Sequence, residues 1–260
     1  MAENFNEACK EAVCIDAGRV YDSCCDRDCL EDLRCYLSVA NQALIQSAVN
    51  VRLKNAEVLN VYVDVEQVNF NKGFYSCDLT FYFLVDLDVY TSNCALPTDV
   101  KGICVFCKKV ILFGGEGNAK IFSSIPSLCQ KDTPLGAGTN LPRCVVQTVD
   151  PVPLSAKICP IENRCENICG IPDSIQEIIG GELAININDC DNAVYVTIGL
   201  FTVVQLIRTV QMLVPVYDFC IPEKHCDDNC SSVTPCDVFS RIDFPTSDFF
   251  PTSLKDDCDC

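Results

Sequence analysis

The alternation of residue types over residues 75–89 constrains this chain more than any other feature. Every odd-numbered position in this run is apolar, and the even-numbered positions include a serine, a threonine and three aspartates. Successive side chains of a β-strand point to opposite faces, so the pattern predicts one long strand with one buried face. Residues 59–66 alternate in the same way, and Asn71-Lys72-Gly73 lies between the two runs. Residues 57–90 are therefore predicted to form a β-hairpin.

Three further segments also indicate β-structure. Residues 108–122 carry three glycines between two apolar runs, which favours a second hairpin. Residues 144–158 are interrupted by two prolines, as expected of an edge strand or a bulge. Residues 193–214 are apolar on one parity, with Gly199 as a candidate bend, over a length well above the usual strand. Strands this long suggest ribbons that reach into neighbouring subunits.

Helix is expected at only two places. The run Asp28-Cys29-Leu30-Glu31 resembles a capping box, and its leucine shares a helical face with Leu33 and Leu37, so a short helix is predicted near residues 28–38. A second capping pattern begins at Ser174 and ends at Gly180. The predicted fold class is mainly β: an antiparallel sandwich or open barrel with long strands, a short N-terminal helix and Cys-rich extensions.

Cysteine content is the second unusual feature, with 22 cysteines among 260 residues. A chain of this size buries roughly 70–75% of its unfolded surface and does not need disulfides to fold. The surplus therefore points to metal ligands, redox chemistry or intermolecular cross-links. It also conflicts with a reducing cytoplasm, unless the protein is made in a cell that later lyses and leaves it outside as a shell.

The cysteines divide the chain into three parts. These are a Cys-rich N-terminal arm with the short helix (1–38), a β-rich core (39–222) that contains a Cys-rich linker (158–190), and a Cys-rich acidic C-terminal tail (223–260). Exposure and mobility concentrate in arms, linkers and tails, where a neighbouring subunit can reach a thiol. The candidate disulfide or cross-link residues are Cys9, Cys14, Cys24, Cys25, Cys29, Cys35, Cys159, Cys165, Cys169, Cys190, Cys220, Cys226, Cys230, Cys236, Cys258 and Cys260.

Other cysteines favour structural roles. Cys77 lies on the apolar parity of its strand and is predicted to be a small buried hydrophobe. Cys104 and Cys107 have the spacing of a zinc knuckle or a redox pair, but positions i and i+3 of a strand point to opposite faces. The main alternative is a zinc site that uses His225 with Cys226 and Cys230, or Cys165 with Cys169.

Nothing in the sequence argues for catalysis. His225 is the single histidine, and it lies in the polar tail, so no catalytic, cofactor-binding or metal residue is assigned. Weak calcium binding by the acidic run 227–229 at a subunit contact stays open, although the run does not match an EF-hand loop. No enzymatic activity is expected.

Charge and hydropathy limit the partners. The formal net charge is −17, which makes a nucleic acid or an anionic membrane surface an unexpected partner. The first ten residues are acidic and lack an apolar core, so no signal peptide is expected. Residues 192–207 form the most apolar stretch, which is too short and too polar for a membrane-spanning helix.

Four segments together carry a resemblance to a known family. They are VYDSCCDRDCLEDLR at 20–34, NKGFY at 71–75, KVILFGGEGNAKIFSS at 109–124 and VPVYDFCIPEK at 214–224. Over residues 20 to 226 the chain resembles the cysteine-rich, self-assembling basal-layer proteins of the clostridial exosporium and their family in spore-forming Firmicutes. The resemblance implies a two-dimensional crystalline array of ring-like oligomers, hexagonal and hence hexameric, joined by disulfides and robust to heat and denaturant.

The expected function is therefore structural. We expect a self-assembling protein that forms a disulfide cross-linked lattice of the spore outer layer, made in the mother-cell cytoplasm, with itself as the main partner and other spore-surface proteins as further ones. The alternatives are a zinc- or metal-binding cysteine-rich protein, and a soluble β-domain interaction module of the spore coat.

Overall fold

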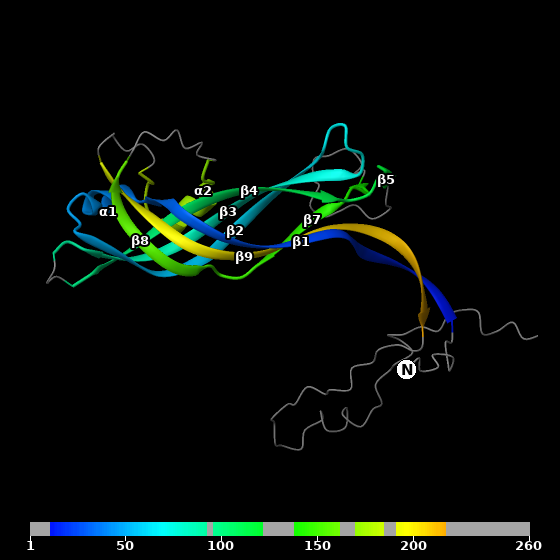
Figure 1. The fold of residues 1–260 in the computed structure, drawn as a ribbon, viewed down its shortest axis with the longest axis horizontal. Coiled ribbons are helices and arrows are strands. Elements are labelled where there is room, and N and C mark those ends of the chain that lie inside the picture. The colour runs from blue at the N-terminus through cyan, green and yellow to red at the C-terminus, as the bar shows by residue number, and fades with distance from the viewer. Residues whose placement is uncertain (1–10, 93–95, 122–137, 162–169, 185–190, 217–260) are drawn as a thin grey trace, which may run out of the picture. The chain divides into compact units, whose positions relative to one another are not determined.

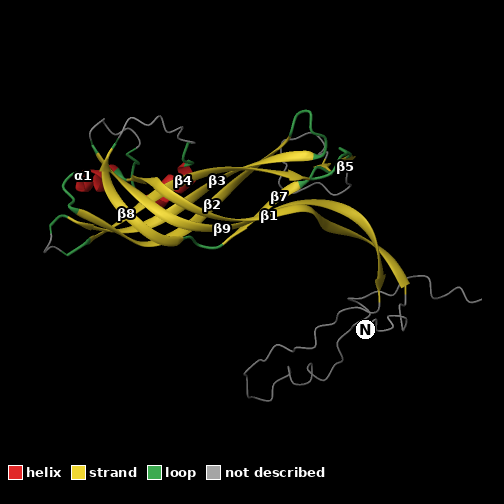
Figure 2. Cartoon of the chain, in the orientation of Figure 1, coloured by secondary structure: helices red, strands yellow, loops and turns green. Residues whose placement is uncertain are grey.

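The computed structural model describes residues 11–92, 96–121, 138–161, 170–184 and 191–216 (Figures 1 and 2). Strands dominate it, as the alternating runs predict. The elements are β1 (Glu11–Leu37), α1 (Val39–Ile45), β2 (Asn50–Gln67), β3 (Phe74–Tyr90), β4 (Thr98–Phe113), β5 (Lys120–Ile121), β6 (Gly138–Thr139), β7 (Arg143–Thr148), β8 (Val152–Pro160), α2 (Asp173–Gln176), the 3-10 helix η1 (Glu177–Ile179) and β9 (Asn192–Val216). No helix in these described ranges is long and apolar enough to cross a membrane.

The chain divides into two compact units. The larger contains Asp16–Val210, and the smaller takes its described residues, 11–15 and 211–216, from the outer ends of β1 and β9. The sequence assigns residues 1–38 to an arm, whereas the structure places residues 16–37 in the sheet of the larger unit.

One sheet forms this unit. Its strand order is β2-β3-β4-β1-β9-β7, with β8 also paired to β9. The pairs β2–β3, β3–β4, β1–β4, β7–β9 and β8–β9 are antiparallel. At the far end of the order, β8 lies against β2, so the sheet curls into a nearly closed barrel (Figure 1). The prediction of a mainly antiparallel β-fold is confirmed, in the form of the open barrel.

The predicted hairpin at 57–90 is also confirmed. It consists of β2 and β3, begins earlier than expected, and turns through Gly73 with a positive φ of 81°. The odd-numbered residues of β3 point into the barrel, where Phe81 and Phe83 are fully buried. Burial of a large apolar side chain contributes about 1.5–3 kcal/mol, so this one strand supplies a large part of the core energy.

The predicted helix near residues 28–38 is wrong. That segment belongs to β1, and the helix α1 begins after it, capped by the Ser38 hydroxyl, which accepts a hydrogen bond from the Asn41 N–H. Asp32 has φ 55°, a left-handed conformation typical of a bulge, which reverses the alternation of the strand. Leu30, Leu33 and Leu37 therefore all join the barrel core, although their spacing imitates a helical face.

The predicted hairpin at 108–122 is wrong as well. Residues 108–113 complete β4, whose pairing with β3 continues to Phe74 opposite Phe113. Residues 120–121 form β5, which pairs with β6 in a separate two-stranded sheet. The glycines between them form a loop in which Gly115 and Gly117 have positive φ. A glycine-rich turn indicates a change of direction but does not identify the strand that pairs next.

The remaining predictions agree with the structure. The two prolines of segment 144–158 separate and bend β7 and β8, with a register shift between Pro153 and Ser155. The run at 193–214 is β9. The helical turns predicted at 174–180 are α2 and η1, which end at Gly180 with φ 71°, but α2 begins after Pro172 and Ser174 does not cap it. Ile171, Ile175 and Leu183, from this segment, cover the outer face of the sheet at Tyr36, Tyr82 and Ile103.

The edge strand β2 has its outward N–H groups occupied. Side-chain oxygens of Asn and Asp accept hydrogen bonds from four of them, at 2.8–3.1 Å: Val51 to Asn50, Val58 to Asp150, Val61 to Asn60 and Val65 to Asp64. Free N–H groups on an exposed edge would recruit a strand from another molecule. These side chains therefore protect the edge against strand addition.

Removing two of these acceptors should allow β2 to pair with a strand of another molecule. We expect N60V/D64V to increase self-association of the reduced protein severalfold, because the Val61 and Val65 N–H groups lose their partners. Size-exclusion chromatography with light scattering in reductant measures the effect. The control E57V/E66V adds the same valines at exposed positions of β2. Equal association of the control would attribute the effect to hydrophobicity alone.

Candidate functional site

Ten of the 22 cysteines lie among the described residues, and their exposure to solvent differs. Four thiols are exposed, three are partly buried and three are buried. The exposed ones are Cys14, Cys25, Cys29 and Cys107; the partly buried ones are Cys24, Cys144 and Cys159; the buried ones are Cys35, Cys77 and Cys104. Cys14 belongs to the smaller unit.

The strand β1 presents cysteines on both of its faces. Cys24 contacts the barrel core, whereas its neighbour Cys25 is exposed. Cys29 is exposed too, and the next residue, Leu30, is buried. The two-residue period of the strand thus places Cys25 and Cys29 on the outer face of the sheet. Both were among the candidate cross-link residues.

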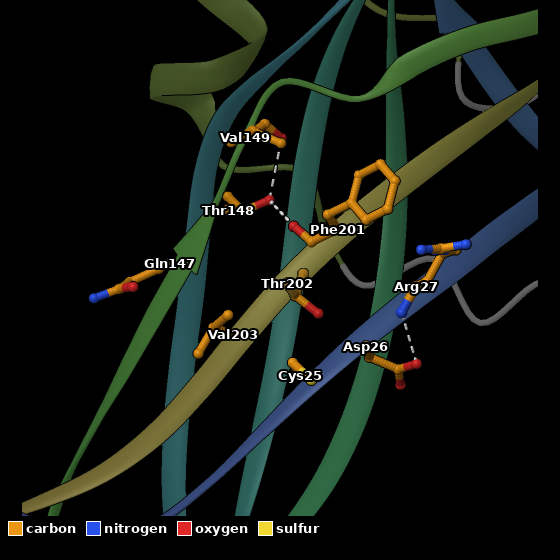
Figure 3. A pocket seen from close by; sticks show the side chains of 9 residues that line it. All are labelled: Cys25, Asp26, Arg27, Gln147, Thr148, Val149, Phe201, Thr202 and Val203. Carbon is orange, nitrogen blue, oxygen red and sulfur yellow. Dashed lines mark hydrogen bonds between the residues drawn. The ribbon is translucent and has the colours of Figure 1, made fainter.

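Cys25 lines an open groove on this outer face (Figure 3). The groove has a volume of about 510 Å³ and lies where β7 ends beside β9 and β1. The Arg27 guanidinium lies over the Phe201 ring, 5.4 Å from its centroid, and the Thr148 hydroxyl donates to the Phe201 carbonyl at 2.9 Å. The lining residues are Cys25, Asp26, Arg27, Gln147, Thr148, Val149, Phe201, Thr202 and Val203.

An ion-pair cluster ties β1 to β4 beside Cys25. The Lys108 ammonium lies 2.6 Å from carboxylate oxygens of both Asp26 and Asp28. Burial opposes the charge of Lys108, but the two hydrogen-bonded carboxylates outweigh it and raise the pKa of the lysine. The hydrogen bond from Lys108 lowers the pKa of Asp26 in return. The backbone that carries Cys25 and Cys29 is therefore held in place by charge as well as by the sheet.

Four thiols interact in pairs inside the barrel. Cys35 on β1 is the direct cross-strand partner of Cys104 on β4, and its thiol shifts the pKa of Cys104. Cys77 on β3 and Cys144 on β7 shift each other's pKa. The expected burial of Cys77 is confirmed, although it contacts a second thiol, which the pattern of its own strand does not reveal.

The interior shifts the acidity of these thiols. Burial raises the pKa of Cys104, and the hydrogen bond with Cys35 adds to the effect. The hydrogen bond with Cys144 raises the pKa of Cys77, with burial as the second cause. The pKa of Cys144 is lowered, because the Cys77 thiol donates its hydrogen bond to the Cys144 sulfur. Cys144 is therefore the stronger nucleophile of its pair.

Cys104 and Cys107 point to opposite faces of β4, as predicted. Cys104 is fully buried, whereas Cys107 is exposed and lies 3.8 Å from the Thr80 hydroxyl. Within the described ranges no three His, Cys, Asp or Glu side chains lie close enough together to hold a metal ion. Cys159, another candidate, lies on β8 opposite Ala193 and is partly buried.

The other candidates lie outside the described residues. So do His225 of the proposed zinc site and the acidic run 227–229. The cysteines concerned are Cys9, Cys165, Cys169, Cys190, Cys220, Cys226, Cys230, Cys236, Cys258 and Cys260.

Sequence reasoning missed a buried arginine. Arg208 on β9 is only 5% exposed, and its guanidinium donates to the carbonyls of Glu116 and Gly117 and to the Tyr75 hydroxyl. It thereby fixes the glycine loop that follows β4. The sequence offered one indication: Arg208 lies two positions after Leu206 on β9, so its side chain shares the inward face of that strand.

Comparisons with protein-family models, with curated proteins and with solved structures find no match. Function is therefore inferred from the arrangement of the chain's own residues.

Breaking the ion-pair cluster of Lys108 with Asp26 and Asp28 should lower the free energy of unfolding. We expect Lys108→Met to destabilise the reduced protein by about 1–2 kcal/mol, because it leaves the half-buried Asp28 without its partner. The exposed pair of Lys109 with Asp78 provides the control, and Lys109→Met should cost less than about 0.5 kcal/mol. Urea unfolding measures both.

The pH dependence of this effect has a definite sign. A carboxylate whose pKa is lowered on folding contributes stability above its unfolded pKa and loses that stability as the pH falls through the folded pKa. The difference in the free energy of unfolding between wild type and K108M should therefore become smaller in acid. A difference that stays constant down to the lowest pH at which the protein remains folded would contradict the electrostatic origin.

Proposed function

We propose that this chain is a structural, self-assembling protein whose subunits are joined by disulfides into a two-dimensional lattice of a spore outer layer, the exosporium. The observation that supports this best is the pair of exposed thiols, Cys25 and Cys29, on the outer face of β1, a central strand of the nearly closed barrel. In this proposal the main partner is a further copy of the chain, in hexameric rings, and other spore-surface proteins attach to the lattice.

Cys25 and Cys29 cannot pair with each other. Cys25 and Cys29 are four residues apart on one strand, which separates their Cα atoms by roughly 13 Å. A disulfide needs Cα atoms within roughly 7 Å. Each thiol therefore requires a partner from outside β1, and a neighbouring subunit can provide one.

The barrel does not depend on these exposed thiols. Its core is formed by long apolar runs on β3 and β9, so oxidation at the outer face leaves the packing intact. The protected edge of β2 also disfavours assembly by strand addition. Contacts through the outer face and covalent links remain as the means of association.

Charge is consistent with covalent assembly. A formal charge of −17 on each subunit opposes close packing of identical copies. Salt screens this repulsion beyond roughly 8–10 Å, and disulfides resist the part that remains. The resemblance to exosporium basal-layer proteins supports the same assembly.

Denaturing electrophoresis of the oxidised full chain tests the proposal. Without reductant we expect a ladder or material too large to enter the gel, and with reductant a single band at 28.6 kDa. Electron microscopy of the oxidised protein should show ordered sheets or rings. A lone monomer band without reductant, together with a monomer peak in light scattering, would refute cross-linked assembly. Stoichiometric zinc and unfolding by a chelator would support the metal-binding alternative instead.

The outer-face cysteines of β1 should contribute to the ladder. We expect C25S/C29S to reduce the fraction of higher bands at least twofold, with unchanged circular dichroism. The matched control is C35A/C104A, which removes two cysteines that are buried and cannot touch a neighbouring subunit. Densitometry of non-reducing gels compares the three proteins. An unchanged ladder in C25S/C29S would exclude these two thiols as links.

A further inference from the structure

We propose that Cys35–Cys104 and Cys77–Cys144 form two intrachain disulfides that close the barrel from the inside. They would constitute a second class of oxidised cysteine, separate from the exposed thiols that join subunits. This inference does not depend on assembly, because both pairs lie within one chain.

The geometry of the first pair fits a cross-strand bridge. Cys35 and Cys104 are opposite each other on adjacent antiparallel strands. Residues in this relation have Cα atoms roughly 4.5–5.5 Å apart, within the range that a disulfide spans.

A glycine provides room for these sulfur atoms. Gly102 precedes Cys104 by two positions and so lies on the same face of β4. A Cβ atom at this position would overlap the Cys35 sulfur and would lie 2.7 Å from Cδ2 of Leu37. Any side chain at Gly102 would therefore collide with the Cys35 sulfur in its present position.

The second pair joins strands that are not neighbours in the sheet. β3 and β7 are separated in the strand order by β4, β1 and β9. Cys77 and Cys144 both belong to the barrel core, where their thiols interact and shift each other's pKa. A bond between them would link β3 to β7 through the interior, on the side where β2 closes against β7 and β8.

Three of the four thiols are closed to a neighbouring subunit. Cys35 is 2% exposed, and both Cys77 and Cys104 are 0% exposed. Cys144 is partly buried, and it interacts with Cys24 as well as with the interior thiol of Cys77. The three buried thiols can therefore be oxidised only to a bridge within their own chain.

The oxidant can be a low-molecular-weight disulfide such as oxidised glutathione. The Cys144 thiolate attacks one of its sulfurs, which forms a mixed disulfide and releases one small thiolate. Cys77 then gives up its proton, attacks the Cys144 sulfur and displaces the second small thiolate. Two protein thiols are oxidised, and one small disulfide is reduced to two thiols that take up the two protons.

The two pairs should differ in reactivity. Cys144 is partly exposed and offers the oxidant a first point of attack in the folded chain. Cys35 and Cys104 are both buried, so their exchange requires β1 and β4 to separate or must occur during folding. A small reductant should likewise open Cys77–Cys144 before Cys35–Cys104.

Peptide mapping of the full chain tests the pairing. The protein is refolded with oxidised glutathione, blocked with N-ethylmaleimide in denaturant, and digested without reduction. Mass spectrometry should show Cys35 linked to Cys104 and Cys77 linked to Cys144, and dithiothreitol should remove both linked peptides. Blocked thiols at all four positions, or links from them to other cysteines such as Cys24, would overturn the proposal.

Thermal unfolding separates a covalent role from simple packing. In oxidised protein, C35A, C104A and the double variant should each lower Tm by roughly 10 °C and to a similar extent, because one bridge closing a loop of roughly 70 residues is lost in all three. In dithiothreitol most of this difference from wild type should disappear. The control C107A, which removes an exposed thiol of β4 outside the proposed links, should leave Tm unchanged. An equal loss of Tm with and without dithiothreitol would overturn the proposal.

Non-reducing electrophoresis and peptide mapping of the same sample test the proposed function and this inference separately. Internal bridges found in a sample that shows no ladder would support the inference and refute cross-linked assembly. A ladder whose subunits lack both internal bridges would support cross-linked assembly and refute the inference.

Discussion

The two-residue period of β1, a strand bonded on both sides within the sheet, determines the chemistry of the cysteines. One face of the strand contributes Cys24 to the core, and the other presents Cys25 and Cys29 to solvent. The bulge at Asp32 then reverses the alternation, so that Cys35 enters the interior. A single strand thus separates thiols that can meet a neighbouring subunit from thiols that can meet only their own chain.

Sequence reasoning succeeded where the alternation of apolar and polar residues within a single strand was enough to identify it. The hairpin of β2 and β3 and the long strand β9 were predictable because burial of one face alone produces their alternation. It failed at residues 28–38, where the bulge at Asp32 gave three leucines a helical spacing. It failed again after β4, because a glycine-rich loop does not specify a pairing partner.

The site was predictable only in part, for a related reason. Burial of Cys77 follows from the local pattern of its strand, whereas Cys25 and Cys29 were expected in an accessible arm and instead lie exposed on the strand β1. The contacts of Cys35 with Cys104 and of Cys77 with Cys144 join residues far apart in sequence, and they depend on strand order and curvature. The role of Arg208 likewise depends on a loop brought to it by the closing of the sheet.

The central position of β1 also has a mechanical consequence. A link attached at Cys25 or Cys29 would apply tension to a strand that is hydrogen-bonded to β4 on one side and to β9 on the other. Pulling along such a strand loads many hydrogen bonds in parallel shear, whereas pulling on an edge strand across its length would peel them one at a time. A lattice joined at these positions would therefore yield at its links, or stretch as a whole, before its individual subunits tore open.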